Sequence, residues 1–262
     1  MCLVVFAWRA HPDYRLILAA NRDEYHRRPA KNAHWWPDRQ HLLAGRDLQA
    51  GGTWLGVSTQ GRFATVTNYR ELQRPGGKLL SRGELVCDFI DSNEGPGQFS
   101  NSIAGQDYAG FNLLVADDDH LVYSSNRGES PVELKPGIYG LSNAALDTPW
   151  PKLVRSRDRL RQLIESDAAN ESSLLRLLAD RQPAPIERIN DPELPFQLAQ
   201  AISAPFILSQ EYGTRCSTSL LWSESGDVEF CERNFDAGGN ATATVRHRFR
   251  ISEGRKPTAA SS

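Results

Sequence analysis

The sequence opens with MCLVVFAWRAHPDYRLILAANRDE (residues 1–24), in which two runs of strand-forming residues flank a short polar connection. Residues 3–8 and 14–20 are dominated by aliphatic and aromatic side chains, and the proline and aspartate between them favour a turn. The stretch therefore predicts a β-hairpin. A cysteine, Cys2, stands at the head of the first strand, and the four polar residues NRDE (21–24) follow directly after the second.

Strand patterns continue along the chain and are interrupted by helical regions. Further strands are predicted at 50–58, 62–68, 110–116, 120–125, 137–142, 212–222, 228–235 and 243–249. A helix is predicted at 81–91, where Ser81 and Glu84 match a capping box, and two more over 149–179, divided near Asp167. Residues 25–40, 93–98 and 183–205 are expected to be loops. Antiparallel hairpins with separate helices indicate an α+β fold, and two sheets packed between helical layers is one arrangement that fits.

The composition is that of a globular protein without a marked electrostatic preference. The chain has 262 residues, of which 40% are hydrophobic and 24% charged, and its net charge is −2. This charge gives no reason to expect nucleic acid or an anionic membrane as a partner. The early apolar run is too short for an integral membrane segment and does not read as a signal peptide. We expect a cytosolic protein with a single domain over residues 1–250 and a disordered tail over 251–262.

The four cysteines show neither CxxC pairing nor metal-ligand spacing with the histidines, so no metal site is expected. In a reducing cytosol they should be free thiols, and Cys87, Cys216 and Cys231 fit buried positions in a helix and in strands. Cys2 has two interpretations. If Met1 is retained, Cys2 is a small apolar residue at the start of a strand. If Met1 is removed, Cys2 carries a free α-amino group beside its thiol.

Several polar residues lie at or beside the ends of predicted strands, where side chains from different strands can meet. They are Cys2, the cluster at 21–24, Asn68, Asn143 and Arg215. The cluster also has two interpretations. It is either part of a shared site, or a solvated turn in which Arg22 pairs locally with Asp23 or Glu24.

Longer blocks of the sequence resemble a known family. The blocks are MCL at the start, LILAANRDEYHRRP (16–29), LLAGRDLQAGGTWLGV (42–57), ATVTNYRE (64–71), GLSNAALDTPWPK (140–152) and YGTRCSTSLL (212–221). They are similar to the NRDE family, the family of the transport and Golgi organisation proteins, and the resemblance extends from Cys2 to about Trp222. That family more distantly resembles N-terminal nucleophile hydrolases of the choloylglycine hydrolase and penicillin V acylase type. The resemblance implies a four-layer αββα sandwich.

In those hydrolases the mature chain begins with a cysteine, followed by an arginine and an aspartate, asparagines and a late arginine. The resemblance therefore carries over as candidate catalytic residues Cys2, Arg22, Asp23, Asn68, Asn143 and Arg215. Arg22 and Asp23 are adjacent here, whereas the hydrolases space that pair further apart. The implied reaction is hydrolysis of a linear, non-peptide amide, or acyl transfer, through an acyl-Cys2 intermediate that requires no cofactor.

Each candidate has a role that elementary chemistry allows. An α-amino group titrates near neutral pH, so it can take the proton of the Cys2 thiol. Arg22 would favour the thiolate and Asp23 would hold the amine. Asn68 or Asn143 would donate a hydrogen bond to the oxyanion. Arg215 would anchor a substrate carboxylate or phosphate, or stabilise the cluster by its charge.

A non-catalytic carrier on the same scaffold is the alternative. Relatives in the family are associated with haem handling and with lipid or acyl-CoA homeostasis, so the resemblance also admits haem as a ligand. His26, His34 and His41 lie near the pair Trp35-Trp36 and several arginines, which could bind propionates. A histidine in a loop is nevertheless more often solvated than a ligand. The ligand is therefore expected to be a small amide, an acyl compound or a haem-like molecule.

Overall fold

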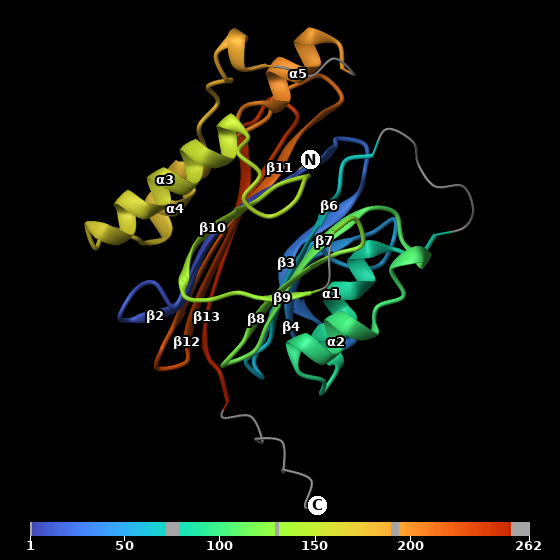
Figure 1. The fold of residues 1–262 in the computed structure, drawn as a ribbon, viewed down its shortest axis with the longest axis vertical. Helices are drawn as coiled ribbons and strands as arrows, with labels where there is room; N and C mark the ends of the chain where they lie inside the picture. Colours follow the sequence, from blue (N-terminus) through green and yellow to red (C-terminus); the bar gives the residue numbers. More distant parts are fainter. Residues whose placement is uncertain (1, 72–78, 129–130, 190–193, 253–262) are drawn as a thin grey trace, which may run out of the picture.

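The computed structural model describes residues 2–71, 79–128, 131–189 and 194–252, which form two antiparallel sheets between two helical layers (Figure 1). The first sheet has six strands in the order β10-β1-β2-β11-β12-β13. Their bounds are β1 Cys2–Trp8, β2 Tyr14–Tyr25, β10 Gly137–Leu141, β11 Tyr212–Ser223, β12 Asp227–Phe235 and β13 Ala241–Arg250. The second sheet has seven strands in the order β3-β4-β5-β6-β7-β8-β9. Their bounds are β3 Ala30–Trp36, β4 Arg39–Asp47, β5 Leu55–Ser58, β6 Phe63–Asn68, β7 Phe111–Ala116, β8 Leu121–Ser125 and β9 Val132–Glu133.

Helices cover the outer face of each sheet. α1 (Arg82–Asp91) and α2 (Pro96–Ser102) pack on the seven-stranded sheet (Figure 1). α3 (Pro151–Glu165) and α4 (Glu171–Leu178) pack on the six-stranded sheet. A further helix, α5 (Phe196–Ile202), precedes β11, at the end of the molecule where the chain begins (Figure 1). The predicted αββα sandwich and the predicted division of the helices near Asp167 are confirmed.

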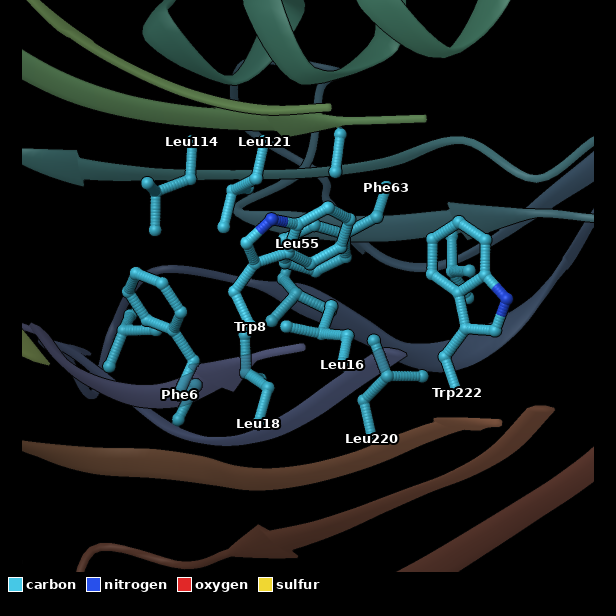
Figure 2. Close-up of a cluster of buried hydrophobic side chains, with 14 of the residues drawn as sticks. Phe6, Trp8, Leu16, Leu18, Leu55, Phe63, Leu114, Leu121, Leu220 and Trp222 are labelled. Atoms are coloured by element: carbon cyan, nitrogen blue, oxygen red, sulfur yellow. The ribbon is translucent and has the colours of Figure 1, made fainter. Parts of the chain in front are cut away.

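Side-chain alternation along the strands determines which layer each residue fills. In β1, Val4, Phe6 and Trp8 lie in the core between the sheets, whereas Leu3 and Val5 pack beneath α3 and α4. Figure 2 shows the inter-sheet core, to which both sheets contribute Leu16, Leu18, Leu55, Phe63, Leu114, Leu121, Leu220 and Trp222. Burial of each large apolar side chain stabilises the fold by roughly 1.5–3 kcal/mol. This core therefore holds the two sheets face to face.

β2 is longer than its apolar residues predict. The strand continues to Tyr25, so the NRDE residues lie within it rather than after it. Pairing with β11 keeps them extended, with Tyr212 opposite Tyr25 and Cys216 opposite Arg22. Asn21, Arg22 and Asp23 are buried. The interpretation of this cluster as a solvated turn is therefore wrong.

Three segments expected to be loops contain regular structure. β3 and the start of β4 occupy much of 25–40, α2 begins at Pro96, and α5 lies within 183–205. These elements are short or polar, and tertiary packing, for example of Phe99 in the core under α1, stabilises them. The predicted capping box is also wrong. Ser81 is the N-cap residue of α1, but its side chain makes no capping hydrogen bond.

The predicted disordered tail begins at residue 251, and its residues from 253 onward lie outside the described part of the chain. Among the helices that the structure describes, none is long and apolar enough to cross a membrane.

Candidate active site

Cys2, Arg22 and Cys216 form a row across three neighbouring strands. Cys2 of β1 lies opposite Arg22 of β2, and Arg22 lies opposite Cys216 of β11. Directly opposite residues of antiparallel strands share a face of the sheet, and Val4 shows that this face looks toward the second sheet. Arg22 and Cys216 are buried, whereas Cys2 is partly exposed. The structure thus places the candidate nucleophile beside the arginine expected to favour its ionised form.

The Arg22 guanidinium contacts Asp47, the last residue of β4, and Trp54, which follows the next turn. Its Nη2 donates a hydrogen bond to Asp47 Oδ2 at 3.2 Å, and its Cζ lies 4.2 Å from the centre of the Trp54 ring. The same Asp47 oxygen accepts a hydrogen bond from Arg28 Nε at 2.6 Å. Arg22 is only 6% exposed. It is therefore a buried cation with a carboxylate and an aromatic face to stabilise its charge.

The backbone of Cys2 is fixed by the residues that follow β10. The Cys2 N–H donates to Asn143 Oδ1 at 3.0 Å, and the Ser142 hydroxyl donates to the Cys2 carbonyl at 2.6 Å. Asn143 Nδ2 in turn donates to the Asn68 carbonyl at 2.7 Å. Asn143 thereby connects the start of β1 to the end of β6 in the other sheet. Cys2 and Asn143, 141 residues apart, meet as predicted from their positions at strand ends.

The environment of the Cys2 sulfur keeps it protonated near neutral pH. Burial raises the pKa of the Cys2 thiol, and the charge of Asp23 raises it further. The chain's amino terminus, the Asp23 backbone N–H and Arg22 act in the opposite direction. The thiol is the resting form, so attack on a carbonyl requires a base.

The Asp23 carboxyl is also buried. Its Oδ1 accepts a hydrogen bond from the Thr214 hydroxyl at 2.7 Å. Burial raises the pKa of Asp23 to about 6, although positive charges nearby, including those of Lys152 and Arg22, lower it. An aspartate in this state is largely ionised at pH 7 and becomes protonated under mildly acidic conditions.

The raised pKa of Asp23, about 6, predicts a pH-dependent contribution to folding. An unfolded aspartate titrates near about 3.9, so between roughly pH 4 and 6 the folded state binds more protons than the unfolded state. The contribution of Asp23 to stability therefore falls as the pH rises through this window. Two pKa units correspond to about 3 kcal/mol.

Asp23→Asn has no carboxyl to titrate and serves as the reference. Relative to this variant, the free energy of unfolding of the wild type should increase by about 2 kcal/mol between pH 7 and pH 4, where the unfolded aspartate is itself about half protonated, as measured by urea titration. Parallel pH profiles for the two proteins would contradict a raised pKa for Asp23.

Two of the candidate catalytic residues, Arg215 and Asn68, take part in hydrogen bonds that involve backbone carbonyl groups. Arg215 Nη1 donates to the carbonyl oxygens of Tyr25, His26 and Arg28 at 3.0, 3.0 and 3.2 Å, and so holds the turn after β2. The side chain of Asn68 is exposed at the end of β6, and its carbonyl is what Asn143 binds. This geometry favours the predicted stabilising role of Arg215 over an anchoring one.

A small cavity lies beside Cys2 between the sheets. Arg22, Trp54 and three threonines, Thr65, Thr67 and Thr218, contribute to its lining. Its volume is about 10 Å³, which is room for about one water molecule. This cavity is therefore too small to hold an acyl chain.

Sequence reasoning assigned no catalytic or binding role to three residues of this region: Asp47, Trp54 and Lys152. Asp47 ends β4 and Trp54 follows a turn, and a carboxylate or an aromatic residue in such a place is common in any protein. Lys152 begins α3, where a lone lysine normally faces solvent. No local pattern distinguishes these three, because their significance arises only from contacts with distant strands.

The histidines proposed as haem ligands already have hydrogen-bond partners in the protein. His26 Nε2 bonds to the Ser209 carbonyl at 3.1 Å, and His41 Nε2 bonds to Asp91 Oδ1 at 2.9 Å. His34 Nδ1 bonds to the Asn32 carbonyl at 2.7 Å. Trp36 is buried, and Trp35 packs on Phe249 with a centroid distance of 5.0 Å. These aromatic residues have packing partners within the fold.

Known proteins resemble this chain in sequence and in fold. The Transport and Golgi organization protein 2 homolog of Bos taurus is 37% identical over 276 aligned residues, covering 96% of this chain and 99% of that protein. The homolog of Homo sapiens is 37% identical over 257 residues, covering 89% and 93%. Among solved structures, the C2A mutant of the conjugated bile acid hydrolase from Clostridium perfringens aligns over 100% of both chains, with a TM-score of 0.51 and 7% identity.

The structural similarity shows that the sandwich has the fold of the N-terminal nucleophile hydrolases. The family described as Transport and Golgi organisation 2 matches residues 1–237. The chain belongs to the Transport and Golgi organisation 2 family.

Proposed function

We propose that this chain is a cytosolic N-terminal cysteine hydrolase or acyltransferase, in which Cys2 becomes the first residue and carries an acyl group. Its substrate is a linear, non-peptide amide or another acyl donor. The main observation in support of the proposal is the hydrogen bond of 3.0 Å between the Cys2 nitrogen and Asn143 Oδ1. In a chain that begins at Cys2 this nitrogen is the α-amine, which is attached to the Cα that carries the CH2–SH side chain and is oriented by the Asn143 acceptor.

The first half-reaction forms a thioester. The α-amine takes the proton of the Cys2 thiol, and the sulfur bonds to the carbonyl carbon while the π electrons move onto oxygen. The oxyanion accepts a hydrogen bond from the second N–H of the Asn143 amide. The C–N bond then breaks, and the α-ammonium returns the proton to the leaving amine. In the second half-reaction the same amine deprotonates water, or another acceptor, which attacks the thioester and releases the cysteine thiol.

Two neighbouring charges support these steps. Arg22 lies opposite Cys2 and favours the thiolate. The Asp23 carboxylate by itself raises the pKa of the thiol, but it would favour the ammonium form of an α-amine at Cys2. The fold is shared with a conjugated bile acid hydrolase, which supports hydrolytic chemistry on this scaffold.

Trapping of the acyl-enzyme tests the proposal. Protein whose first residue is Cys2 is mixed with p-nitrophenyl acetate or p-nitrophenyl octanoate and quenched in acid. The intact mass should rise by one acyl group, which digestion should locate at Cys2, and Cys2→Ala should remain unmodified. A wild-type protein that neither donor acylates, or equal acylation of Cys2→Ala, would contradict the proposal.

If this test fails, the alternative function is favoured: a non-catalytic carrier of haem, a lipid or acyl-CoA. Titration of haemin against the protein, followed by absorption, then tests for haem binding. A saturable absorption shift that is lost on substitution of Cys2, His26, His34 or His41 would assign haem binding to this scaffold.

A further inference from the structure

α3 carries a buried lysine that the proposed mechanism does not use. Lys152 is the second residue of the helix, is 2% exposed, and is among the largest fully buried side chains of the protein. Its Nζ has no hydrogen-bond partner within the part of the chain that the structure describes. Burial of an ammonium group costs several kcal/mol unless nearby charges offset it. An ammonium group buried at this position therefore requires a group of opposite charge nearby.

The sheet presents such a partner to α3. Asn21 donates to the Leu178 carbonyl at the end of α4, so its side chain lies on the helix-covered face of β2. Asp23 is two residues further along the same strand and shares that face. α3 packs against β1 and β10 on this face. Burial lowers the pKa of Lys152, whereas the charges of Asp23 and then of an ionised Cys2 act in the opposite direction and favour the ammonium form.

We propose that Lys152 is a positioning residue of the Cys2 site, whose buried ammonium holds Asp23 ionised, offsets the charge by which Asp23 disfavours the Cys2 thiolate and, together with Arg22 on the opposite face, stabilises that thiolate. The start of β1 thus lies between two cations, one on each face of the sheet. This role rests on the proposed function, because it concerns ionisation of the nucleophile. When the Sγ–H bond breaks, the proton passes to the α-amine, and Lys152 keeps its own proton throughout.

Other charged or titratable groups also face these residues. Cys2 is within electrostatic reach of Arg82 at the start of α1, of Cys216 on β11 and of the chain's amino terminus. Arg82 Nη1 donates to the Gly110 carbonyl at 3.0 Å, and Cys216 lies beside the Glu232 carboxyl. The Asp23 carboxylate interacts electrostatically with Lys152, Arg22 and Cys2. Substitution of Lys152 leaves all the others in place, so a changed titration reports on this one cation.

The pH dependence of Cys2 alkylation measures the effect. Full-length wild type, Lys152→Met and Lys152→Arg are treated with iodoacetamide between pH 6 and 11, and the rate at Cys2 is followed by mass spectrometry. An opposite charge nearby typically lowers an acid pKa by about 1–3 units, so the midpoint should rise by about one pH unit or more in Lys152→Met. Lys152→Arg keeps the charge and should stay close to the wild type. Ser156→Ala, one turn further along the same buried face, is the matched control and should cause no shift.

Carbon-13 NMR of the Asp23 carboxyl, assigned with Asp23→Asn, gives a readout that does not depend on a reactive Cys2. Its titration midpoint should rise in Lys152→Met and return in Lys152→Arg. An unreactive Cys2 combined with this pattern would overturn the proposed function while supporting the pairing of Lys152 with Asp23. An unchanged Asp23 midpoint in Lys152→Met, or an equal rise in Ser156→Ala, would overturn the role of Lys152. Should Lys152→Met not fold, recovery of folding in Lys152→Met/Asp23→Asn would support the pair, and no recovery would refute it.

Discussion

Arg22→Met is expected to lower the free energy of unfolding by about 3 kcal/mol, because it removes one member of a buried ion pair. The methionine side chain fills much of the same space but leaves Asp47 without its partner at 3.2 Å and the Trp54 ring without its cation. Arg28 still neutralises Asp47, which places the loss at the lower end of the range for a broken buried pair. Urea titration at pH 7 measures the change.

Arg27→Met provides the control for Arg22→Met. Arg27 is exposed beyond the end of β2, so its substitution should change the free energy of unfolding by no more than about 0.5 kcal/mol. Equal effects of the two substitutions would show that the Arg22 guanidinium does not occupy the buried position between Asp47 and Trp54.

Cys2→Ala is expected to reduce acyl transfer by at least about 10³-fold, because a chain without this sulfur cannot form the thioester. The substitution removes one sulfur atom from a partly exposed residue at the start of a strand, so the fold should be retained. Turnover of an acyl donor that wild type accepts, followed at pH 7.5, gives the measurement.

The control for Cys2→Ala is Cys87→Ala in α1. Cys87 is buried in the core beneath that helix, and burial raises the pKa of its thiol to about 11. Its loss should cost about 1–2 kcal/mol of stability through the cavity left behind, without affecting turnover. Retained turnover in Cys2→Ala, or turnover lost only in Cys87→Ala, would remove Cys2 from the reaction.

Local patterns in the sequence predicted the elements that form the frame of the fold. The hairpins β1–β2 and β5–β6 follow from strand periodicity and turn residues, and α3 and α4 follow from leucines at helical spacing. The layered arrangement required a family resemblance, because periodicity does not state which sheets pack together. The extension of β2 through NRDE escaped prediction for a related reason. Its polar residues are kept extended by β11, almost 190 residues later in the chain.

The candidate site was predictable to the extent that it lies at strand ends. Cys2 begins β1 and Asn143 follows β10, so their positions at strand ends predict the contact that the structure shows. Arg22 lies within β2, and pairing of that strand with β1 places it opposite Cys2. The orientations of Asn68 and Arg215 depend on local backbone geometry, including a register shift beside Arg215, which residue types do not reveal. Lys152 escaped prediction because a lysine at the start of a helix carries no sign of burial until the facing strand is known.

Intact-mass analysis of the purified protein, before and after one equivalent of iodoacetamide, tests the central claim most directly. The account predicts a chain that begins at Cys2 and takes up a single label on that residue, while the three other cysteines stay unmodified until the protein is unfolded. A chain that retains Met1, with Cys2 unlabelled under conditions that modify all four cysteines after unfolding, would contradict it.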